Sequence, residues 1–169
     1  FVLIYVLLIL LAMQIIGVYF VRALEEKLVD NFQTSIKNRV ELLEYTIREE
    51  IVKKRSEDDP TLEEDIGRVL DDSKTSDISE IRVINDRSKI IGTSDPNNQS
   101  LVGQVSGEKE VKRALAVGLG HEDIYLDDKT KDRIWVYTAP ITSNEEVIGA
   151  IYLVGEIESV YDQMSEINK

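Results

Sequence analysis

The sequence has no cysteine, a single histidine and only three prolines among its 169 residues. The lack of cysteine excludes disulfides and thiolate metal sites, and one histidine, His121, excludes a metal site built from several imidazoles. Neither a G-x-S-x-G nucleophile motif nor a glycine-rich phosphate-binding loop occurs. We therefore expect no catalytic residue, no metal site and no cofactor in this chain.

Basic residues are also in short supply, since 20 lysines and arginines stand against 32 aspartates and glutamates, a net charge of −12. Such an acidic surface argues against nucleic acid as a partner and against a flat docking surface on anionic lipid. A calcium loop counted from Asp71 fails, because it needs glycine where Ser76 stands and glutamate where Arg82 stands. The acidic pairs are therefore interpreted as solvated surface.

Charge is absent from residues 1–21, whose one strongly polar side chain is Gln14. A helix of this length is about 31 Å long, enough for a hydrocarbon core of about 30 Å. A signal peptide would have a shorter apolar core and a cleavage site of small residues, whereas this run ends in Phe20, Val21 and Arg22. Residues 1–21 are therefore predicted to span a membrane, with Gln14 contacting a second membrane helix.

The segment from Ala23 to about Lys54 has neither proline nor glycine, and its apolar residues recur at nearly every fourth position. This spacing predicts an amphipathic helix over 22–54 that continues out of the membrane helix as one rod. Two interpretations of its apolar stripe stay open and are compatible. The stripe packs on its own domain, or its first part also pairs with a second copy as a dimer and signalling contact, through Leu24, Leu28, Phe32 and Ile36.

After a charged break at 53–60, the pattern changes from helical to alternating. Helices are predicted from Thr61 to Leu70, from about Ser106 to Gly118, and from Glu156 to Lys169. Strands are predicted at 80–85, 88–93, 121–126, 133–141 and 146–154. Hairpin-sized connections favour an α+β fold over 55–155, in which a central antiparallel sheet of about five strands is flanked by helices.

One polar and aromatic cluster stands out in the strand that begins at Arg133. Alternation places Arg133, Trp135 and Tyr137 on one face of this strand. Such a face can bind an anionic or sugar-like ligand by charge-assisted hydrogen bonds and ring stacking. The alternative interpretation is that Trp135 and Tyr137 pack on the sheet, with Arg133 at its rim.

Several segments resemble one protein family. Residues 5–20, YVLLILLAMQIIGVYF, strongly resemble the first membrane helix of the WalK (YycG) family, the sensor histidine kinases of cell-wall homeostasis in low-GC Gram-positive bacteria. Shorter segments similar to the extracellular part of these kinases lie at 131–137, 147–152 and 160–163, and Cache-like loops lie at 93–96 and 101–103. The resemblance covers nearly the whole chain.

The resemblance implies a Cache (PDC-type, PAS-like) sensor domain at the cell membrane, with the chain extracellular after about residue 22. It implies that ATP and Mg²⁺ belong to a kinase domain outside these residues, and no catalytic residue is carried over. The expected partners are a second copy, the membrane, a response regulator acting through the cytoplasmic part, and a cell-wall-derived ligand or a membrane regulatory protein. The helices at the two ends of the domain are expected to shift relative to each other during signalling.

Two other functions stay open at this point. The same Cache fold can belong to a chemoreceptor or a cyclic-dinucleotide enzyme, or the chain can be a membrane-anchored binding module without enzymatic output. Residues beyond Lys169 decide between these functions, because the output domain lies there in the WalK family.

Overall fold

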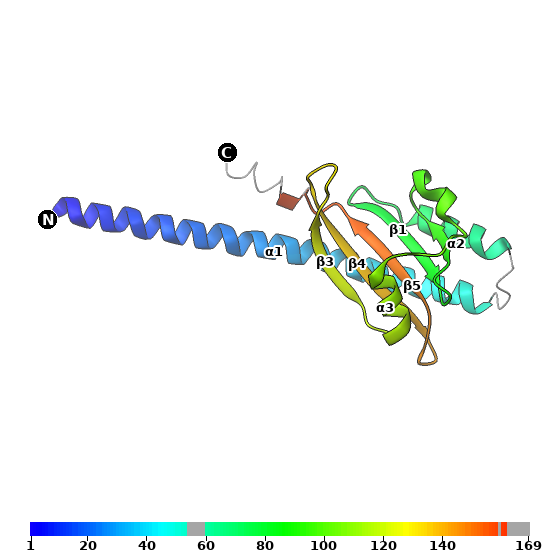
Figure 1. Ribbon diagram of the computed structural model, residues 1–169. Helices are drawn as coiled ribbons and strands as arrows, with labels where there is room; N and C mark the ends of the chain where they lie inside the picture. Colours follow the sequence, from blue (N-terminus) through cyan, green and yellow to red (C-terminus); the bar gives the residue numbers. More distant parts are fainter. Residues whose placement is uncertain (54–59, 159, 162–169) are drawn as a thin grey trace.

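One helix dominates the structure, a computed structural model that describes residues 1–53, 60–158 and 160–161. Helix α1 spans Val2–Lys53 without a break, and its 52 residues make a rod of about 78 Å. Its first half projects away from the domain, and its second half lies across the sheet (Figure 1). The rod predicted from the apolar run and the stripe is therefore a single helix.

The projecting half of α1 has the properties of a membrane span. Its most apolar stretch has a mean hydropathy of 2.6, and nothing else in the structure covers it. Every side chain from Phe1 to Phe20 is exposed. A bare apolar surface of this length requires an apolar surrounding, which a bilayer supplies. The chain is therefore membrane-anchored through α1.

The domain is built around a five-stranded sheet in which every neighbouring pair is antiparallel. Its strands are β1 (Ile78–Asn85), β2 (Ile90–Thr93), β3 (His121–Leu126), β4 (Arg133–Ser143) and β5 (Glu146–Gly155). The order across the sheet is β2-β1-β5-β4-β3, so the last strand in sequence lies at the centre. The five predicted strands and the α+β class are confirmed.

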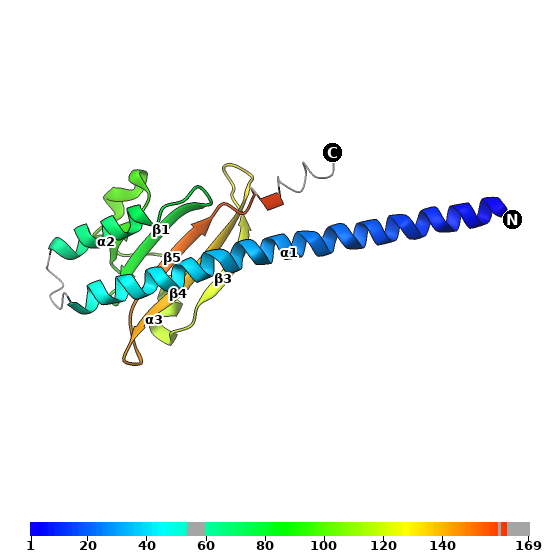
Figure 2. The same ribbon diagram turned by 180° about the vertical axis from the view of Figure 1, so that it is seen from behind.

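Helices cover both faces of the sheet (Figures 1 and 2). Helix α1 and helix α2 (Pro60–Asp72) lie on one face, and helix α3 (Lys109–Val117) lies on the other. The larger core forms beneath α1 and α2, where α1 contributes the buried side chains of Ile36, Val40, Leu43 and Ile47. The smaller core forms beneath α3 around Val111 and Ala114. The alternating strand pattern thus supplies two apolar faces, one for each helical layer.

The structure differs from the sequence-based prediction at several boundaries. A 3₁₀ helix, η1 (Pro96–Leu101), lies between β2 and α3, where the sequence analysis predicted neither a helix nor a strand. Helix α3 begins after its N-cap residue Glu108 and not near Ser106, whose hydroxyl accepts a hydrogen bond from the Glu108 amide. Helix α2 begins at Pro60, one residue before the expected cap at Thr61.

The helix predicted from Glu156 to Lys169 falls largely on residues 159 and 162–169, which lie outside the described part of the chain. Residues 158, 160 and 161 are helical. Gly118 ends α3 in the left-handed conformation, with φ of 73°, as expected of a C-cap glycine.

The α1 stripe is predicted to be the main source of domain stability. Ile47 is fully buried, so Ile47→Ala should lower the free energy of unfolding by about 2–5 kcal/mol. Val105 is 72% exposed, and Val105→Ala should change this free energy by less than about 0.5 kcal/mol. Urea unfolding of the whole chain in detergent, followed by the fluorescence of its single tryptophan, measures both. Equal losses in the two variants would contradict this account.

Candidate functional site

The membrane-proximal end of the sheet meets α1 at a cluster of three aromatic rings and a glycine. This cluster, named here the aromatic junction, consists of Phe32 of α1, Trp135 and Tyr137 of β4, and Gly155 at the end of β5. The Phe32 and Trp135 ring centroids lie 6.1 Å apart at 67°, and the Trp135 and Tyr137 centroids lie 5.4 Å apart at 19°. These edge-on and stacked geometries are favourable for aromatic pairs, so the junction joins helix and sheet by specific contacts.

Gly155 permits the close approach of β5 to these rings. A Cβ atom at this position would lie 3.1 Å from Cε3 of Trp135 and 3.6 Å from the ring of Phe32. Gly155 is the register partner of Trp135 and of Ile78, so it sits between β4 and β1. The last residue of the central strand therefore touches α1 directly, at the point where the chain leaves the sheet.

The residues that follow β5 lead from the junction to the juxtamembrane part of α1. Ile157 is fully buried in the core beneath α1. Tyr161 lines a surface hollow together with Arg22, Glu26 and Val29 of α1. The start of α1 outside the membrane and the segment after β5 thus lie side by side.

Arg133 contacts this same segment. Its guanidinium lies over the ring of Tyr161, with Cζ 4.0 Å from the ring centroid. Its backbone amide donates to Oε2 of Glu158 at 2.8 Å. Arg133 therefore ties the start of β4 to the segment after β5.

The three residues predicted to bind a ligand, Arg133, Trp135 and Tyr137, take part in two separate contacts. Trp135 is fully buried between the sheet and α1, and its indole Nε1 has no hydrogen-bond partner in the described part of the chain. Tyr137 is half-buried, its ring lies 5.6 Å from Nζ of Lys37, and burial raises the pKa of its hydroxyl while Lys37 opposes that shift. The structure brings Trp135 and Tyr137 together with Phe32, whereas Arg133 points to Tyr161.

The predicted dimer and membrane contacts also occupy different surroundings. Ile36 is fully buried in its own domain, and Phe32 packs on Trp135. Leu24 and Leu28 are partly buried on the juxtamembrane part of α1. Gln14 is exposed on the bare membrane span and borders a shallow surface hollow with Gly17 and Val21.

Ion pairs and hydrogen bonds hold α1 on both sides of its buried stripe. Nη2 of Arg39 donates to Oδ2 of Asp77 at 2.6 Å, and Nη1 donates to Thr75. On the other side, Nζ of Lys37 lies 2.5 Å from Oε2 of Glu122 in β3. Burial raises the pKa of Asp77, but the hydrogen bonds from Arg39 and Thr75 and the charge of Arg39 outweigh it, so the pKa lies below its ordinary value of 3.8. These polar contacts fix the rotation of α1 over the sheet.

A row of polar side chains crosses all five strands on the face covered by α3. The register pairs His121 with Thr138, Thr138 with Tyr152, Tyr152 with Arg82, and Arg82 with Thr93. Paired residues of an antiparallel sheet lie on the same face, so the row is continuous. The Thr138 hydroxyl is fully buried and lacks a hydrogen-bond partner among the described residues.

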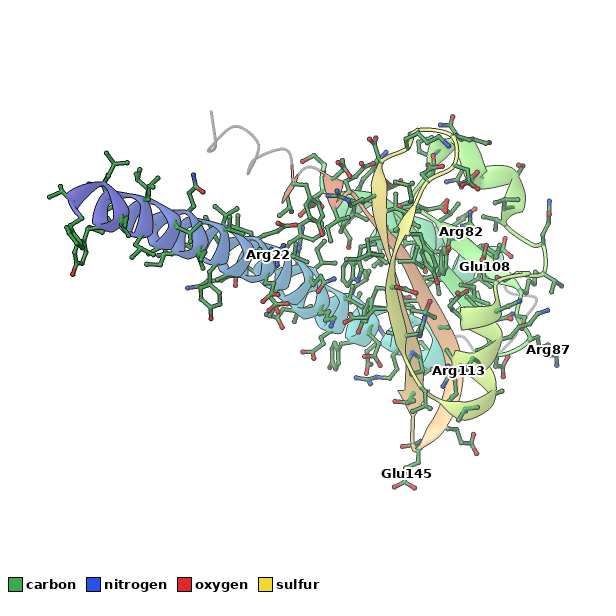
Figure 3. All side chains as sticks on the ribbon, turned by 60° about the vertical axis from the view of Figure 1, so that its left-hand side comes forward. Arg22, Arg82, Arg87, Glu108, Arg113 and Glu145 are labelled. Carbon is green, nitrogen blue, oxygen red and sulfur yellow. The ribbon has the colours of Figure 1, made fainter. Side chains whose placement is uncertain are left out.

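A buried carboxylate organises one end of this polar row. Glu80 accepts from Nε of Arg82 at 2.5 Å, from Thr93 at 3.0 Å and from Nδ2 of Asn98 at 2.6 Å. Burial and the carboxylate of Glu108 raise the pKa of Tyr152 to about 12, although Arg82 opposes that shift. Figure 3 labels Arg82 of β1 and Glu108, the residue before α3, the two charged groups that act most on Tyr152.

The polar row consists of three hydroxyl groups, one imidazole and one guanidinium, and its Thr93 and Thr138 are buried. These groups suit polar recognition by hydrogen bonding. No group of three or more metal-ligating side chains lies close enough to hold a metal ion within the part of the chain that the structure describes. Sequence reasoning missed this row. Its signal was the alternation of Glu80 and Arg82 in a strand whose other face is apolar.

Gly155→Ala is predicted to disturb the aromatic junction. The new Cβ would press on Trp135, so the free energy of unfolding should fall by about 1–3 kcal/mol and the tryptophan emission should shift. Gly107 has no atom within 4 Å of an added Cβ, so Gly107→Ala should leave the emission unchanged. Urea unfolding and emission spectra of the two variants measure this. The same response in both would show that the junction is not closely packed.

Comparison with known proteins gives consistent matches. The sequence profile of the WalK sensor protein kinase Cache domain matches residues 65–155. Sensor histidine kinase WalK of Bacillus subtilis is 36% identical over 168 residues, which is 98% of this chain and 27% of that protein. Sensor protein kinase WalK of Staphylococcus aureus is 37% identical over 171 residues, 99% of this chain and 28% of that protein.

Among solved structures, the sensory domain of the Campylobacter jejuni chemoreceptor Tlp3, with isoleucine bound, superposes with a TM-score of 0.65 at 14% identity, over 86% of this chain and 60% of that chain. This likeness shows the fold alone. The chain spans about a quarter of the length of the WalK proteins it matches. The matched domain covers more than half of this chain, and the sequence identity to both WalK proteins exceeds a third along nearly the whole chain. The chain therefore belongs to the WalK family of sensor protein kinases and carries the family's Cache sensor domain.

Proposed function

We propose that this chain is the signal-sensing and transmission region of a two-component sensor histidine kinase, anchored by α1 and extracellular after about residue 22. The observation that carries the proposal is the aromatic junction, where the end of the central strand contacts the helix that enters the membrane. In this proposal, ATP, Mg²⁺ and the response regulator act on parts of the parent protein outside this chain, which spans about a quarter of the length of its WalK relatives.

The proposed mechanism is a shift of α1 relative to the segment after β5. Both ends of the domain converge on the same short region, because Tyr161 lies against the juxtamembrane part of α1 and Arg133 holds Tyr161. A change in the sheet therefore moves two chain segments that point to one membrane surface. Such a shift biases a two-state output if its two states differ in free energy by a few kcal/mol.

The polar row beneath α3 is the proposed entry point for a signal. It lies on the opposite face of the sheet from α1, and its central member, Tyr152, belongs to the strand that ends at Gly155. A cell-wall-derived ligand with polar groups, or a membrane regulatory protein that presses on α3, would act on the same strand. The high identity to WalK along the whole chain favours a kinase output over a chemoreceptor, a cyclic-dinucleotide enzyme or a binding module without output.

The coupling role of the junction is tested in the complete parent protein. Phe32→Ala removes the edge contact with Trp135 and should change the rate of autophosphorylation by at least about fivefold, since coupling between sites is typically worth about 1–3 kcal/mol. Val105→Ala, which truncates a side chain that is 72% exposed, should stay within about twofold of the unaltered rate.

The assay is ATP-dependent formation of acid-labile phosphate in membrane vesicles. The absence of such phosphate in the unaltered parent would overturn the kinase assignment. Equal rates in Phe32→Ala and in the unaltered protein would leave the assignment intact and overturn the transmission role of the junction.

A further inference from the structure

A pocket opens between α1 and α2, on the face of the sheet opposite the polar row. Figure 2 shows both helices on the same side of the strands. The pocket has a volume of about 440 Å³, and small-molecule sites in proteins typically have roughly 300–1,000 Å³. Its apolar lining comes from both helices and from two strands, through Val40, Leu43, Val69, Ile78, Ile81 and Leu153. We name it the α1–α2 pocket.

The two helices are held on the sheet at separate places, which leaves space between them. Helix α2 packs directly on β2, since a Cβ atom at Gly92 would lie 2.6 Å from Cγ2 of Ile66. Helix α1 packs through its buried stripe, and Arg39 ties it to Asp77, the residue before β1. Protein cores contain few voids larger than a water molecule, so a space of this size suits a bound molecule.

The floor of the pocket belongs to the larger core. Ile81 of β1 and Leu153 of β5 line it and are 1% and 0% exposed. Val40 and Leu43 form the α1 wall, and Val69 forms the α2 wall. A molecule in the pocket would therefore contact the side chains that hold α1 on the sheet, and its apolar surface would be removed from water.

One hydrogen-bond donor in the lining has no acceptor. Arg39 donates through Nη1 to Thr75 and through Nη2 to Asp77. Its Nε is buried and lacks a hydrogen-bond partner within the part of the chain that the structure describes. A buried N–H without a partner is costly, so an acceptor oxygen on a ligand would satisfy this group.

The other polar groups of the lining narrow the class of ligand. The hydroxyls of Thr46 and Ser73 donate to carbonyl oxygens of their own helices. Asp72 is exposed and also lines the pocket, and the charge of Arg39 is already balanced by Asp77. An anionic ligand would be repelled by Asp72 and by the net charge of −12, whereas a neutral carbonyl or ether oxygen would not.

The pocket lies too far from the bilayer for a membrane lipid to fill it. Residues 22–40 of the continuous helix α1 separate the predicted membrane span from the pocket, a distance of about 28 Å along the helix. A bilayer lipid would have to leave the membrane to reach Val40. The ligand is therefore a diffusible small molecule.

We propose that the α1–α2 pocket binds a neutral small molecule with an apolar body and one acceptor oxygen. The body lies against Leu43 and Val69, and the oxygen accepts from Nε of Arg39. This site differs from the polar row beneath α3 in its position and in the chemistry of its ligand. The bound molecule contacts both helices, so it stabilises one position of α1 relative to α2. Binding does not require a kinase output, so the proposal goes beyond the proposed function.

Photolabelling with benzophenone tests the pocket, because this probe is neutral and has two apolar rings and one carbonyl oxygen. The whole chain in lipid nanodiscs is irradiated with the probe, which adds to nearby C–H bonds, and is then digested with trypsin. Peptides 40–48 and 69–74 carry the two walls of the pocket. Peptide 114–129 carries exposed apolar side chains of α3 and β3, so it reports adsorption on apolar surface.

Both wall peptides should be labelled at least tenfold more than peptide 114–129, with saturation as the probe concentration rises. Val69→Trp fills part of the pocket and should lower the labelling of peptide 40–48 at least tenfold. Val105→Trp, at a side chain that is 72% exposed, should leave it within about twofold. Equal labelling of peptide 40–48 in the two variants, label confined to the membrane span, or stronger label on peptide 114–129 would each overturn the proposal.

A second pair of variants tests the donor. Arg39→Met removes Nε and should lower the labelling of peptide 69–74 about fivefold, whereas Asp77→Asn removes the paired charge but keeps Nε and should stay within about twofold. Equal labelling in the two folded variants would overturn the proposed ligand chemistry. Urea unfolding identifies a variant that does not fold, and Val69→Trp then decides the outcome. Because no phosphorylation is measured, failure of the kinase assignment leaves these results unaffected.

Discussion

Ile36, Val40, Leu43 and Ile47 hold α1 against the sheet, and every other feature of this molecule depends on that contact. Their burial makes the second half of a membrane helix into one wall of a domain core. Without it, the membrane span would be a tether that leaves the domain free to turn. Because of this burial, the sheet and the membrane helix turn together. The ion pairs of Lys37 and Arg39 fix that rotation on either side of the buried stripe.

The central strand, β5, connects the face of the sheet beneath α3 with helix α1. One face of β5 bears Tyr152, in the polar row beneath α3, and the other face packs Ile151 and Leu153 into the core beneath α1. The same strand ends at Gly155, where a missing side chain brings it into contact with Phe32 and Trp135. A ligand or protein that acts on the α3 face would therefore reach α1 through one strand. Packed interiors respond to such displacements by switching between arrangements and not by gradual deformation.

Local sequence patterns predicted the helices and strands of this fold. They did not predict the strand order or the side-chain contacts, because both depend on residues that are far apart in the sequence. The lack of charge in residues 1–21 predicted the membrane span, and alternation predicted five strands close to their observed bounds. The strand order was not predictable, because the pairing of β1 with β5 joins residues far apart in sequence. Arg133 and Trp135 share a strand face by alternation, but Arg133 turns to Tyr161, a residue of a segment whose position no local rule fixes.

The contacts made by the apolar stripe of α1 also could not be predicted from its spacing. Its spacing predicted a helix, yet Leu24 and Ile36 belong to different surroundings, since a stripe that drifts around the helix meets the sheet only from Phe32 onward. The polar row was missed because its members come from five strands, and the register that aligns them is a tertiary property. Family resemblance supplied what neither alternation nor helical period contains, namely the expectation that this sensor domain serves a histidine kinase.

The most direct test of the account is to change the phase between the membrane span and the domain within α1. Residues inserted between Arg22 and Ala23 rotate the domain by about 100° each if the helix is continuous. An insertion of two helix-forming residues turns the domain to the opposite side of the rod, whereas seven residues restore its original orientation to within about 20°. Autophosphorylation of the parent kinase should therefore be altered by two residues and restored by seven. An output that is unchanged by both, or that falls steadily with insertion length, would contradict the claim that α1 transmits the state of the domain to the membrane.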